Sequence, residues 1–231
     1  MKDGRLGDEI HRELGSNKAE LMQRVILVRH GESALNAANE HQKILCGQFD
    51  TPLTDRGRDQ ARSAGMALMG RRDLNITQAI SSTLARTRET LDLILQQMPV
   101  RPEVLAPMAA FNERSLGIFE GRLEEDVFRE YPHYQSDPQF CKFREHFEQK
   151  APQGENLEDV TRRAWTAFES VRTCAAGDLL IVSHCNTIRC LIARALRLSE
   201  FETVRLRIRH ATPIVLEGER DFRIDSDFPL G

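Results

Sequence analysis

The sequence lacks the features that mark membrane proteins and disulfide-rich secreted proteins. It has no run of about eighteen apolar residues, so we expect no transmembrane helix. Residues 1–23 contain no apolar segment typical of a signal peptide. The five cysteines are an odd number and include no C-x-x-C pair. A reduced, cytoplasmic protein is therefore the simplest interpretation.

The sequence also lacks an excess of charge of one sign. Its 32 Lys and Arg residues face 35 Asp and Glu residues, which gives a net charge of −3. Because the sequence has no excess of Lys and Arg, we expect no nucleic-acid partner. Because it has no long acidic tract, we expect no long disordered region. A local pocket lined with arginines remains compatible with this balance. With 40% hydrophobic and 29% charged residues, the chain has the composition of a soluble globular protein.

Short apolar runs alternate with amphipathic stretches along the chain, without internal repeats. The runs that predict strands are residues 25–28, 78–82, 178–184 and 212–217, with a less regular extended stretch at 103–111. The stretches that predict helices, caps included, are residues 54–70, 83–98, 155–175 and 186–198. This alternation predicts an α/β fold, a three-layer α/β/α sandwich with a largely parallel central sheet.

The domain organisation predicted from these elements is simple. Residues 1–22 form a polar N-terminal extension, and residues 23–231 form a single domain. The polar stretch at about 122–150 is predicted to be mostly helical. We interpret it as an insertion because both of its flanks supply core elements.

Three of the predicted strands end in polar side chains. Arg29, His30 and Gly31 follow the first strand. Ser81 and Ser82 close the second strand, and Arg86 follows one turn into the next helix, while Ser183 and His184 close the strand at 178–184. Because ligands of open α/β sheets bind beyond the carboxyl ends of the strands, we expect these groups to converge.

Two imidazoles and two guanidiniums at one site suit the chemistry of phosphate. Arginine binds phosphate oxygens through two parallel hydrogen bonds. A neutral imidazole can attack phosphorus, and a second, protonated imidazole can stabilise the group being transferred. Arg86 stands in the first helical turn, where the helix dipole disfavours a cation, which favours a functional role over the competing Arg88.

Other titratable groups receive structural interpretations. We expect the remaining five histidines to be surface or satisfied core residues: His11, His41, His133, His146 and His210. Cys185, beside His184, is interpreted as a small packing residue.

Several longer motifs extend this pattern. They are LVRHGES-x-x-N, GQFDTPLTDRGRDQA, SSTLARTRET, NERSLGIFEG, GEN and SHCNTIR. Together they resemble the histidine phosphatase superfamily, with its phosphoglycerate-mutase-like fold. The motifs occur in the order typical of that family and, with the apolar runs around them, span residues 24–217.

The resemblance implies a role for each matching residue. His30 would be the nucleophile that becomes phosphohistidine, and Gly31 would allow the tight turn that exposes it. Arg29, Arg86 and His184 would hold the phosphoryl group, assisted by Asn36. 

A carboxylate in the NERSLGIFEG motif would complete the site. Glu113 would act as general acid and then as general base. Glu120, next to Gly121, is expected to be structural. Asn156 of GEN is expected to cap a helix together with Asp159.

The motifs point to two branches of the family. Ser115 and Leu116 stand where mutases have the last two residues of ERHY, so the stretch ERSLGIFEG resembles the phosphatase branch, which includes broad-specificity phosphatases. The segment LEEDVFREYPHY…FREHFEQKAPQGENLEDV resembles the bisphosphatase domain of fructose-2,6-bisphosphatase. In contrast, SHCNTIRCLI and ATPIVLE resemble the mutases equally well. Asn186, Cys46 and Gly47 match substrate contacts of the mutases.

From these motifs we predict a metal-independent phosphatase that hydrolyses a small phosphorylated metabolite through phosphohistidine. The alternatives are a 2,3-bisphosphoglycerate-dependent phosphoglycerate-type mutase and a non-catalytic binding module on the same fold. Since neither metal-ligand spacing nor a glycine-rich nucleotide loop occurs, we expect no metal and no cofactor. We expect neither nucleic acid nor a membrane as partner, and the sequence leaves a homo-oligomer open.

Overall fold

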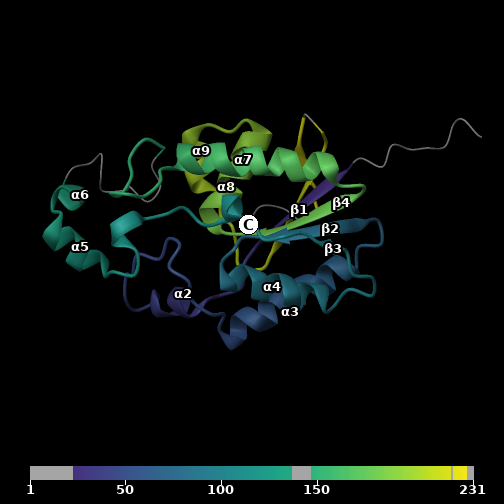
Figure 1. Cartoon of the computed structure of the whole chain (residues 1–231), viewed down its shortest axis with the longest axis horizontal. Helices are drawn as coiled ribbons and strands as arrows, with labels where there is room; N and C mark the ends of the chain where they lie inside the picture. Colours follow the sequence, from purple (N-terminus) through teal and green to yellow (C-terminus); the bar gives the residue numbers. More distant parts are fainter. Residues whose placement is uncertain (1–22, 137–146, 220, 228–231) are drawn as a thin grey trace, which may run out of the picture.

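The computed structural model describes residues 23–136, 147–219 and 221–227. Its centre is a six-stranded sheet in the order β3-β2-β4-β1-β5-β6 (Figure 1). The strands are β1 (Arg24–Arg29), β2 (Ile76–Ser81), β3 (Glu103–Val104), β4 (Asp178–Ser183), β5 (Pro213–Glu217) and β6 (Arg223–Ile224). Strands β1 to β4 pair in parallel, whereas β5 runs antiparallel to β1 and to β6.

Helices cover both faces of this sheet (Figure 1). Helices α3 (Asp55–Met69) and α4 (Ala85–Leu95) pack together on one face. Helices α7 (Leu157–Cys174), α8 (Cys185–Leu196) and α9 (Glu200–Arg205) lie on the other. The predicted three-layer α/β/α sandwich with a largely parallel sheet is thus confirmed.

The alternation of side chains along β1 explains why both faces are covered. Val25 and Leu27 belong to the core cluster under α7 and α8, while Ile26 and Val28 belong to the cluster under α3 and α4. All four side chains are fully buried. Successive residues of a strand point to opposite faces, so a continuous apolar run requires a partner layer on each side.

The helix ends follow the local signals in the sequence. The Thr54 side chain accepts a hydrogen bond from the amide of Gly57 and caps α3, which ends at Gly70. Asn156 and Asp159 form the predicted reciprocal cap of α7. The predicted helix at 83–98 is shorter in the structure, since α4 ends at Leu95.

One end of the molecule is built from irregular segments around a small core of its own. This core contains Leu45, Leu116, Phe119, Val127 and Tyr134, and its segments include α5 (Glu124–Glu130) and α6 (His133–Ser136), whereas α2 (Ala34–Ala38) lies nearer to α3 (Figure 1). Within the stretch predicted to be mostly helical, these two short helices α5 and α6 are present, and residues 147–150 are not helical. Residues 137–146 lie outside the described residues, as does the predicted extension 1–22.

Two glycines bring the end of β1 against the start of α3. A Cβ on Gly31 would lie 2.2 Å from the carbonyl oxygen of Gly57, and a Cβ on Gly57 would lie 2.0 Å from that of Glu32. Any larger residue at either position would push the two segments apart. This contact therefore sets the turn that follows His30.

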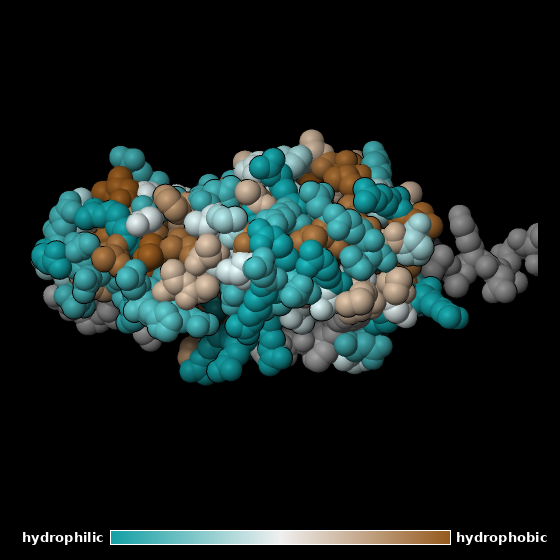
Figure 2. Space-filling view, turned by 90° about the horizontal axis from the view of Figure 1, so that it is seen from below, coloured by the Kyte–Doolittle hydropathy of each residue, from teal (hydrophilic) through white to brown (hydrophobic). Residues whose placement is uncertain are grey.

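The surface seen from the side of α2, α3 and α4 is mainly hydrophilic, with separate hydrophobic patches (Figure 2). Large exposed apolar side chains in the described part of the chain are Phe49, Met66, Met69, Val100, Val104, Ile118 and Phe201. In the same part of the chain, none of the helices is long and apolar enough to cross a membrane.

Candidate active site

The carboxyl ends of β1, β2 and β4 meet at one edge of the sheet. Arg29 pairs with Ser183 and Ser81 pairs with Val182, so the polar groups that follow these strands lie together. A cavity of about 300 Å³ opens there. Its lining contains all but one of the residues predicted for the site: Arg29, His30, Asn36, Cys46, Gly47, Arg86, Glu113 and Asn186. The exception is His184, which lies behind the surface of the cavity, fully buried against His30.

His30 is held in one orientation and one tautomer. Its Nδ1 lies 2.7 Å from the carbonyl oxygen of Gly31, which can only accept a hydrogen bond, so Nδ1 carries the proton. Burial lowers the pKa of His30 well below its usual value, and the charges of Arg29 and Arg86 lower it further. The ring is therefore neutral, and its Nε2 retains a lone pair.

His184 packs against His30, with ring centroids 5.1 Å apart and planes inclined by 59°. Its Nε2 lies 2.8 Å from the hydroxyl of Ser82, which in turn lies 2.7 Å from the hydroxyl of Thr87. Burial lowers the pKa of His184 well below its usual value, and the electrostatic effects of the nearby His30 and Arg86 lower it further. The ring of His184 is thus neutral as long as no anion lies beside it.

Arg86 is almost fully buried in the first turn of α4. Its guanidinium donates to the carbonyl oxygens of Gly47 at 3.0 Å and Phe49 at 2.9 Å, and so it shapes the segment that contains Cys46. Arg29 donates to the carbonyl oxygen of Ile208 at 2.9 Å. Both arginines are anchored by the backbone and keep other nitrogens available.

Three buried nitrogens beside the cavity lack a hydrogen-bond partner among the residues that the structure describes. They are Nε of Arg29, Nε of Arg86 and Nδ1 of His184. Leaving such a buried polar group unsatisfied costs about 1–3 kcal/mol. An oxyanion in the cavity would supply acceptors to these nitrogens, and two of the three are permanently charged.

Backbone amides hold the carboxylate of Glu113 at the wall of the cavity. Its carboxylate accepts hydrogen bonds from the amide of Arg114 at 2.8 Å and from that of Asn186 at 3.3 Å. Asn186 stands in the first turn of α8, where the helix dipole favours a negative charge. The carboxylate is thereby turned towards the N-terminus of α8, beside His184.

The remaining predicted contacts, Asn36, Cys46 and Gly47, also line the cavity. Asn36 closes a capping box with Ser33 at the start of α2. Gly47 has a φ of +49°, and a Cβ there would meet the carboxylate of Glu120, so its backbone conformation accounts for the glycine. Burial raises the pKa of the Cys46 thiol.

Glu120 fits the structural role expected for it. Its carboxylate accepts hydrogen bonds from the hydroxyl of Ser115 at 3.0 Å and from the amide of Leu116 at 2.8 Å. It therefore stabilises the turn that follows Glu113.

Several residues at the site were not identified from the sequence. The cavity is also lined by Asn39, Ile44, Arg114, Leu116, Cys185 and Arg189. Arg114 could have been found beside Glu113, and Arg189 stands three residues after Asn186, on the same face of α8. His210, interpreted as a surface or core residue, instead contacts His30, with ring centroids 5.6 Å apart. No local signal marks it, because 180 residues separate the two positions.

In residues 23–136, 147–219 and 221–227, no group of three or more His, Cys, Asp or Glu side chains is arranged so that it could hold a metal ion.

Comparison with known proteins gives relatives over almost the whole described chain. A family model for the histidine phosphatase superfamily (branch 1) matches residues 25–224. A 2,3-bisphosphoglycerate-dependent phosphoglycerate mutase of Bartonella bacilliformis is 31% identical over 203 residues, which cover 87% of this chain and 94% of that protein. The mutase of the same name from Methylobacterium radiotolerans is 29% identical, with coverages of 87% and 92%.

Solved structures share the fold. Bacillus stearothermophilus YhfR matches with a TM-score of 0.75 at 23% identity and covers 90% of this chain and 98% of that one. A mycobacterial glucosyl-3-phosphoglycerate phosphatase matches with a TM-score of 0.71 at 23% identity, with coverages of 88% and 97%. At these identities the likeness concerns the fold, whereas the family model matches the sequence over residues 25–224, a range that includes the residues of the cavity. The chain belongs to the histidine phosphatase superfamily, branch 1.

Proposed function

We propose that this protein is a phosphatase that hydrolyses a small phosphorylated metabolite through a phosphohistidine at His30. The observation that carries the proposal is the state of His30. It is a buried, neutral imidazole whose Nδ1 proton is fixed by Gly31, beside two arginines with unsatisfied buried nitrogens. A lone pair on Nε2 next to a ready-made oxyanion site is what attack on phosphorus requires.

In the first half of the reaction, Arg29 and Arg86 bind the phosphoryl oxygens and Nε2 of His30 attacks phosphorus in line. Glu113, in its protonated form, gives a proton to the leaving alcohol. His184 becomes protonated beside the dianion, because a neighbouring negative charge raises the pKa of an imidazole. Its unpartnered Nδ1 can then donate to a phosphoryl oxygen.

In the second half, water replaces the alcohol. Glu113, now a carboxylate, removes a proton from this water, which attacks the phosphohistidine. Inorganic phosphate leaves, and His30 returns to its neutral state. No step requires a metal, so we expect activity to persist in the presence of a chelator.

Two features favour hydrolysis over phosphoryl transfer. Ser115 and Leu116 replace the histidine and tyrosine typical of mutases; Ser115 bonds to Glu120, and Leu116 lines the cavity with an apolar side chain. The solved structures of similar fold include proteins named as phosphatases, among them alpha-ribazole phosphatase of Shigella flexneri.

The second candidate function is a phosphoglycerate-type mutase, in which phosphohistidine donates to a second phosphorylated molecule. The relatives named as mutases, at 29–31% identity, favour it. The lining of the cavity by Cys46, Gly47 and Asn186 also agrees with it. A binding module without catalysis is disfavoured because His30, Glu113 and His184 are all present and positioned.

The experiment is a screen of the purified protein against sugar phosphates, phosphoglycerates and nucleotides. Free phosphate and isomerised product are both quantified, with and without a bisphosphorylated primer. A phosphatase releases phosphate without a primer. Rapid interconversion of 3- and 2-phosphoglycerate with little phosphate release would replace the proposal by the mutase.

A further inference from the structure

We propose that Arg163 and Glu155, an ion pair at the start of α7, are positioning residues that hold Glu113 in its catalytic orientation. This inference rests on the proposed function, because it concerns the general acid of that reaction. Neither residue lines the cavity, and neither was among the residues predicted for the site.

Arg163 holds the backbone on the N-terminal side of Glu113 and at Glu113 itself. Its Nη1 donates to the carbonyl oxygens of Ala110 at 2.8 Å and Asn112 at 3.0 Å. Its Nη2 donates to the carbonyl oxygen of Glu113 at 3.1 Å. One guanidinium therefore fixes three carbonyls of a four-residue segment.

Glu155 holds the backbone on the other side. Its carboxylate bonds twice to Arg163, at 2.7 Å and 2.8 Å. The same carboxylate accepts from the amide of Ser115 at 3.0 Å, and the amide of Glu155 donates to the carbonyl oxygen of Ser115 at 2.9 Å. Glu113 thus lies between two anchored neighbours.

The charge state of Glu155 suits this arrangement. Burial would raise its pKa, but hydrogen bonds from Arg163 and from the amide of Ser115 outweigh burial, so the pKa of Glu155 is lowered. The carboxylate of Glu155 is therefore ionised at neutral pH. It forms charge-assisted hydrogen bonds with Arg163, and because each side chain is only 22% exposed, water competes little for these bonds.

Such an anchor matters because Glu113 lies in a segment without helix or strand. Its carboxylate reaches the amides of Arg114 and Asn186 only while the backbone keeps its path. Misplacing a reacting group by about 1 Å can reduce the rate on the order of 10²-fold.

The segment also has anchors that are independent of Arg163. The hydroxyl of Thr187 donates to the backbone carbonyl oxygen of Asn112 at 2.7 Å. The hydroxyl of Thr83 donates to the side-chain oxygen of Asn112 at 2.8 Å. Removal of Arg163 is therefore expected to loosen the position of Glu113 while the sheet and its helices remain folded.

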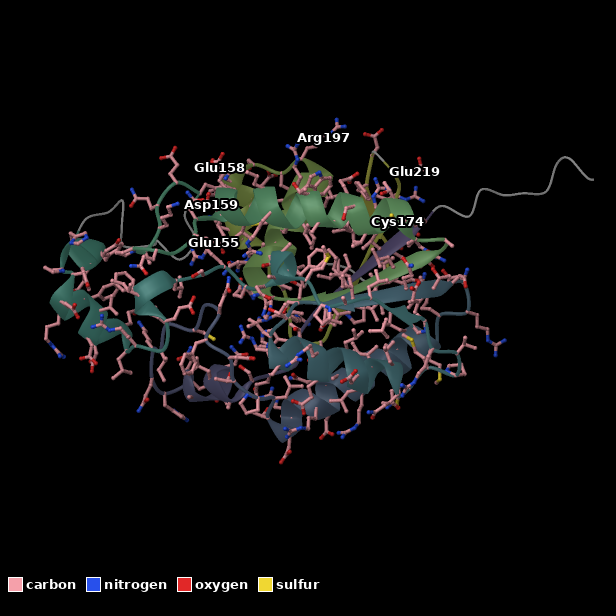
Figure 3. The ribbon with its side chains drawn as sticks, viewed as in Figure 1. Glu155, Glu158, Asp159, Cys174, Arg197 and Glu219 are labelled. Atoms are coloured by element: carbon pink, nitrogen blue, oxygen red, sulfur yellow. The ribbon has the colours of Figure 1, made fainter. Side chains whose placement is uncertain are left out.

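The neighbouring residues of α7 provide matched controls. Arg162 is 68% exposed and pairs with Glu158 and Asp159 on the outer side of the helix. Figure 3 shows Glu158 at the outer surface and Glu155 on the side turned towards the body of the molecule. Arg162→Ala and Glu158→Gln thus remove the same chemical groups without touching the segment of Glu113.

The experiment compares Arg163→Ala, Arg163→Lys and Glu155→Gln with these controls on two substrates. An alkyl phosphate needs protonation of its leaving group, whereas p-nitrophenyl phosphate needs little. We expect Arg163→Ala to lower kcat/KM, which reports phosphorylation of His30, on the order of 10²-fold for the alkyl phosphate and much less for p-nitrophenyl phosphate. Arg163→Lys recovers only part of the loss, since an ammonium cannot reproduce the fork that meets the carbonyls and the carboxylate.

A second comparison uses the Glu113→Gln variant. If Arg163 acts through Glu113, Arg163→Ala adds little further loss in the Glu113→Gln background, because the two changes remove one function. Equal losses of kcat/KM for both substrates in Arg163→Ala, or full additivity with Glu113→Gln in kcat/KM, would overturn the proposal.

A third readout does not depend on the role of Glu113 as an acid. Hydrogen exchange of the amides of residues 112–116 should accelerate in Arg163→Ala and Glu155→Gln, while the amides of β1 and β4 keep their protection. Unchanged exchange would overturn the positioning role. If exchange accelerates but Glu113→Gln loses kcat/KM equally on both substrates, the positioning role stands and Glu113 is refuted as the acid.

Discussion

The rings of His30 and His210 meet edge to face, with centroids 5.6 Å apart and planes inclined by 62°. The Nδ1 of His210 lies 3.1 Å from the carbonyl oxygen of His30, to which it donates. The backbone of this strand end is also held by the amide of Ala211, which donates to the carbonyl oxygen of Arg29. Because the hydrogen bond from Ala211 also holds this backbone, we expect the main effect of His210 to be the contact of its ring with the ring of His30, which restricts the orientation of the nucleophile.

We therefore predict different results for two substitutions of His210. His210→Ala removes the ring that contacts His30 and should slow phosphorylation of His30 about tenfold, because the nucleophile is then less well oriented. His210→Phe keeps a ring of similar shape and should retain most of the rate. Single-turnover kinetics of phosphoenzyme formation provide the measurement. A loss of equal size in both variants would show that the hydrogen bond, rather than the ring, holds His30.

The buried histidines predict how stability depends on pH. Burial holds the pKa values of His30 and His184 well below the usual range and lowers that of His210 to about 4. In the unfolded chain, histidine ionises near pH 6.5, so below that pH the unfolded state binds more protons than the folded state. Their contribution to stability is complete above about pH 6.5 and is lost as the pH falls towards the folded-state pKa values.

Urea unfolding between pH 7.5 and pH 5 measures this effect. We expect the free energy of unfolding to fall by about 1.4 kcal/mol per pH unit for each histidine that stays neutral when folded. His210→Asn removes one of the three and should make the decline shallower. A free energy of unfolding that stays constant over this range would contradict neutral, buried histidines.

Binding of an anion at Arg86 predicts stabilisation by inorganic phosphate. A ligand that binds only the folded state raises its stability by about 2.7 kcal/mol at a hundredfold excess over Kd. Arg86→Lys keeps the charge but loses the planar fork, so it should give a smaller rise in Tm with phosphate. Arg88→Ala, two residues further along α4 and exposed, is the control and should respond like the unmodified protein. An equal rise in Arg86→Lys would remove Arg86 from the anion site.

The sequence predicted those parts of the site that lie at strand ends. Arg29, His30 and His184 each follow an apolar run, and parallel pairing of β1 with β4 brings them together. The caps at Thr54 and Asn156 were likewise predictable, because each depends on a few neighbouring residues.

Other parts depend on contacts that no local pattern reveals. His210 meets His30 through a loop that returns to β1, and Arg163 reaches Glu113 from the inner side of α7. The antiparallel course of β5 and the short strand β6 are also set by tertiary packing, since period and composition look alike in parallel and antiparallel strands. Loop segments around Glu120 and Gly47 belong to this group, because a hydrogen bond from the backbone amide of Leu116 and the positive φ of Gly47 determine them.

The central claim is covalent phosphorylation of His30 followed by hydrolysis, and trapping the phosphoenzyme tests it most directly. A substrate labelled in its phosphoryl group is mixed with the protein and quenched within the first turnover, and the label is located by peptide mapping. We expect label on His30 that is stable to alkali and labile to acid, as a phosphoramidate is. This label should be absent from His30→Ala and should be released as inorganic phosphate without a bisphosphorylated primer. Acid-stable label, or label that persists in a folded His30→Ala protein, would show that another residue is the nucleophile.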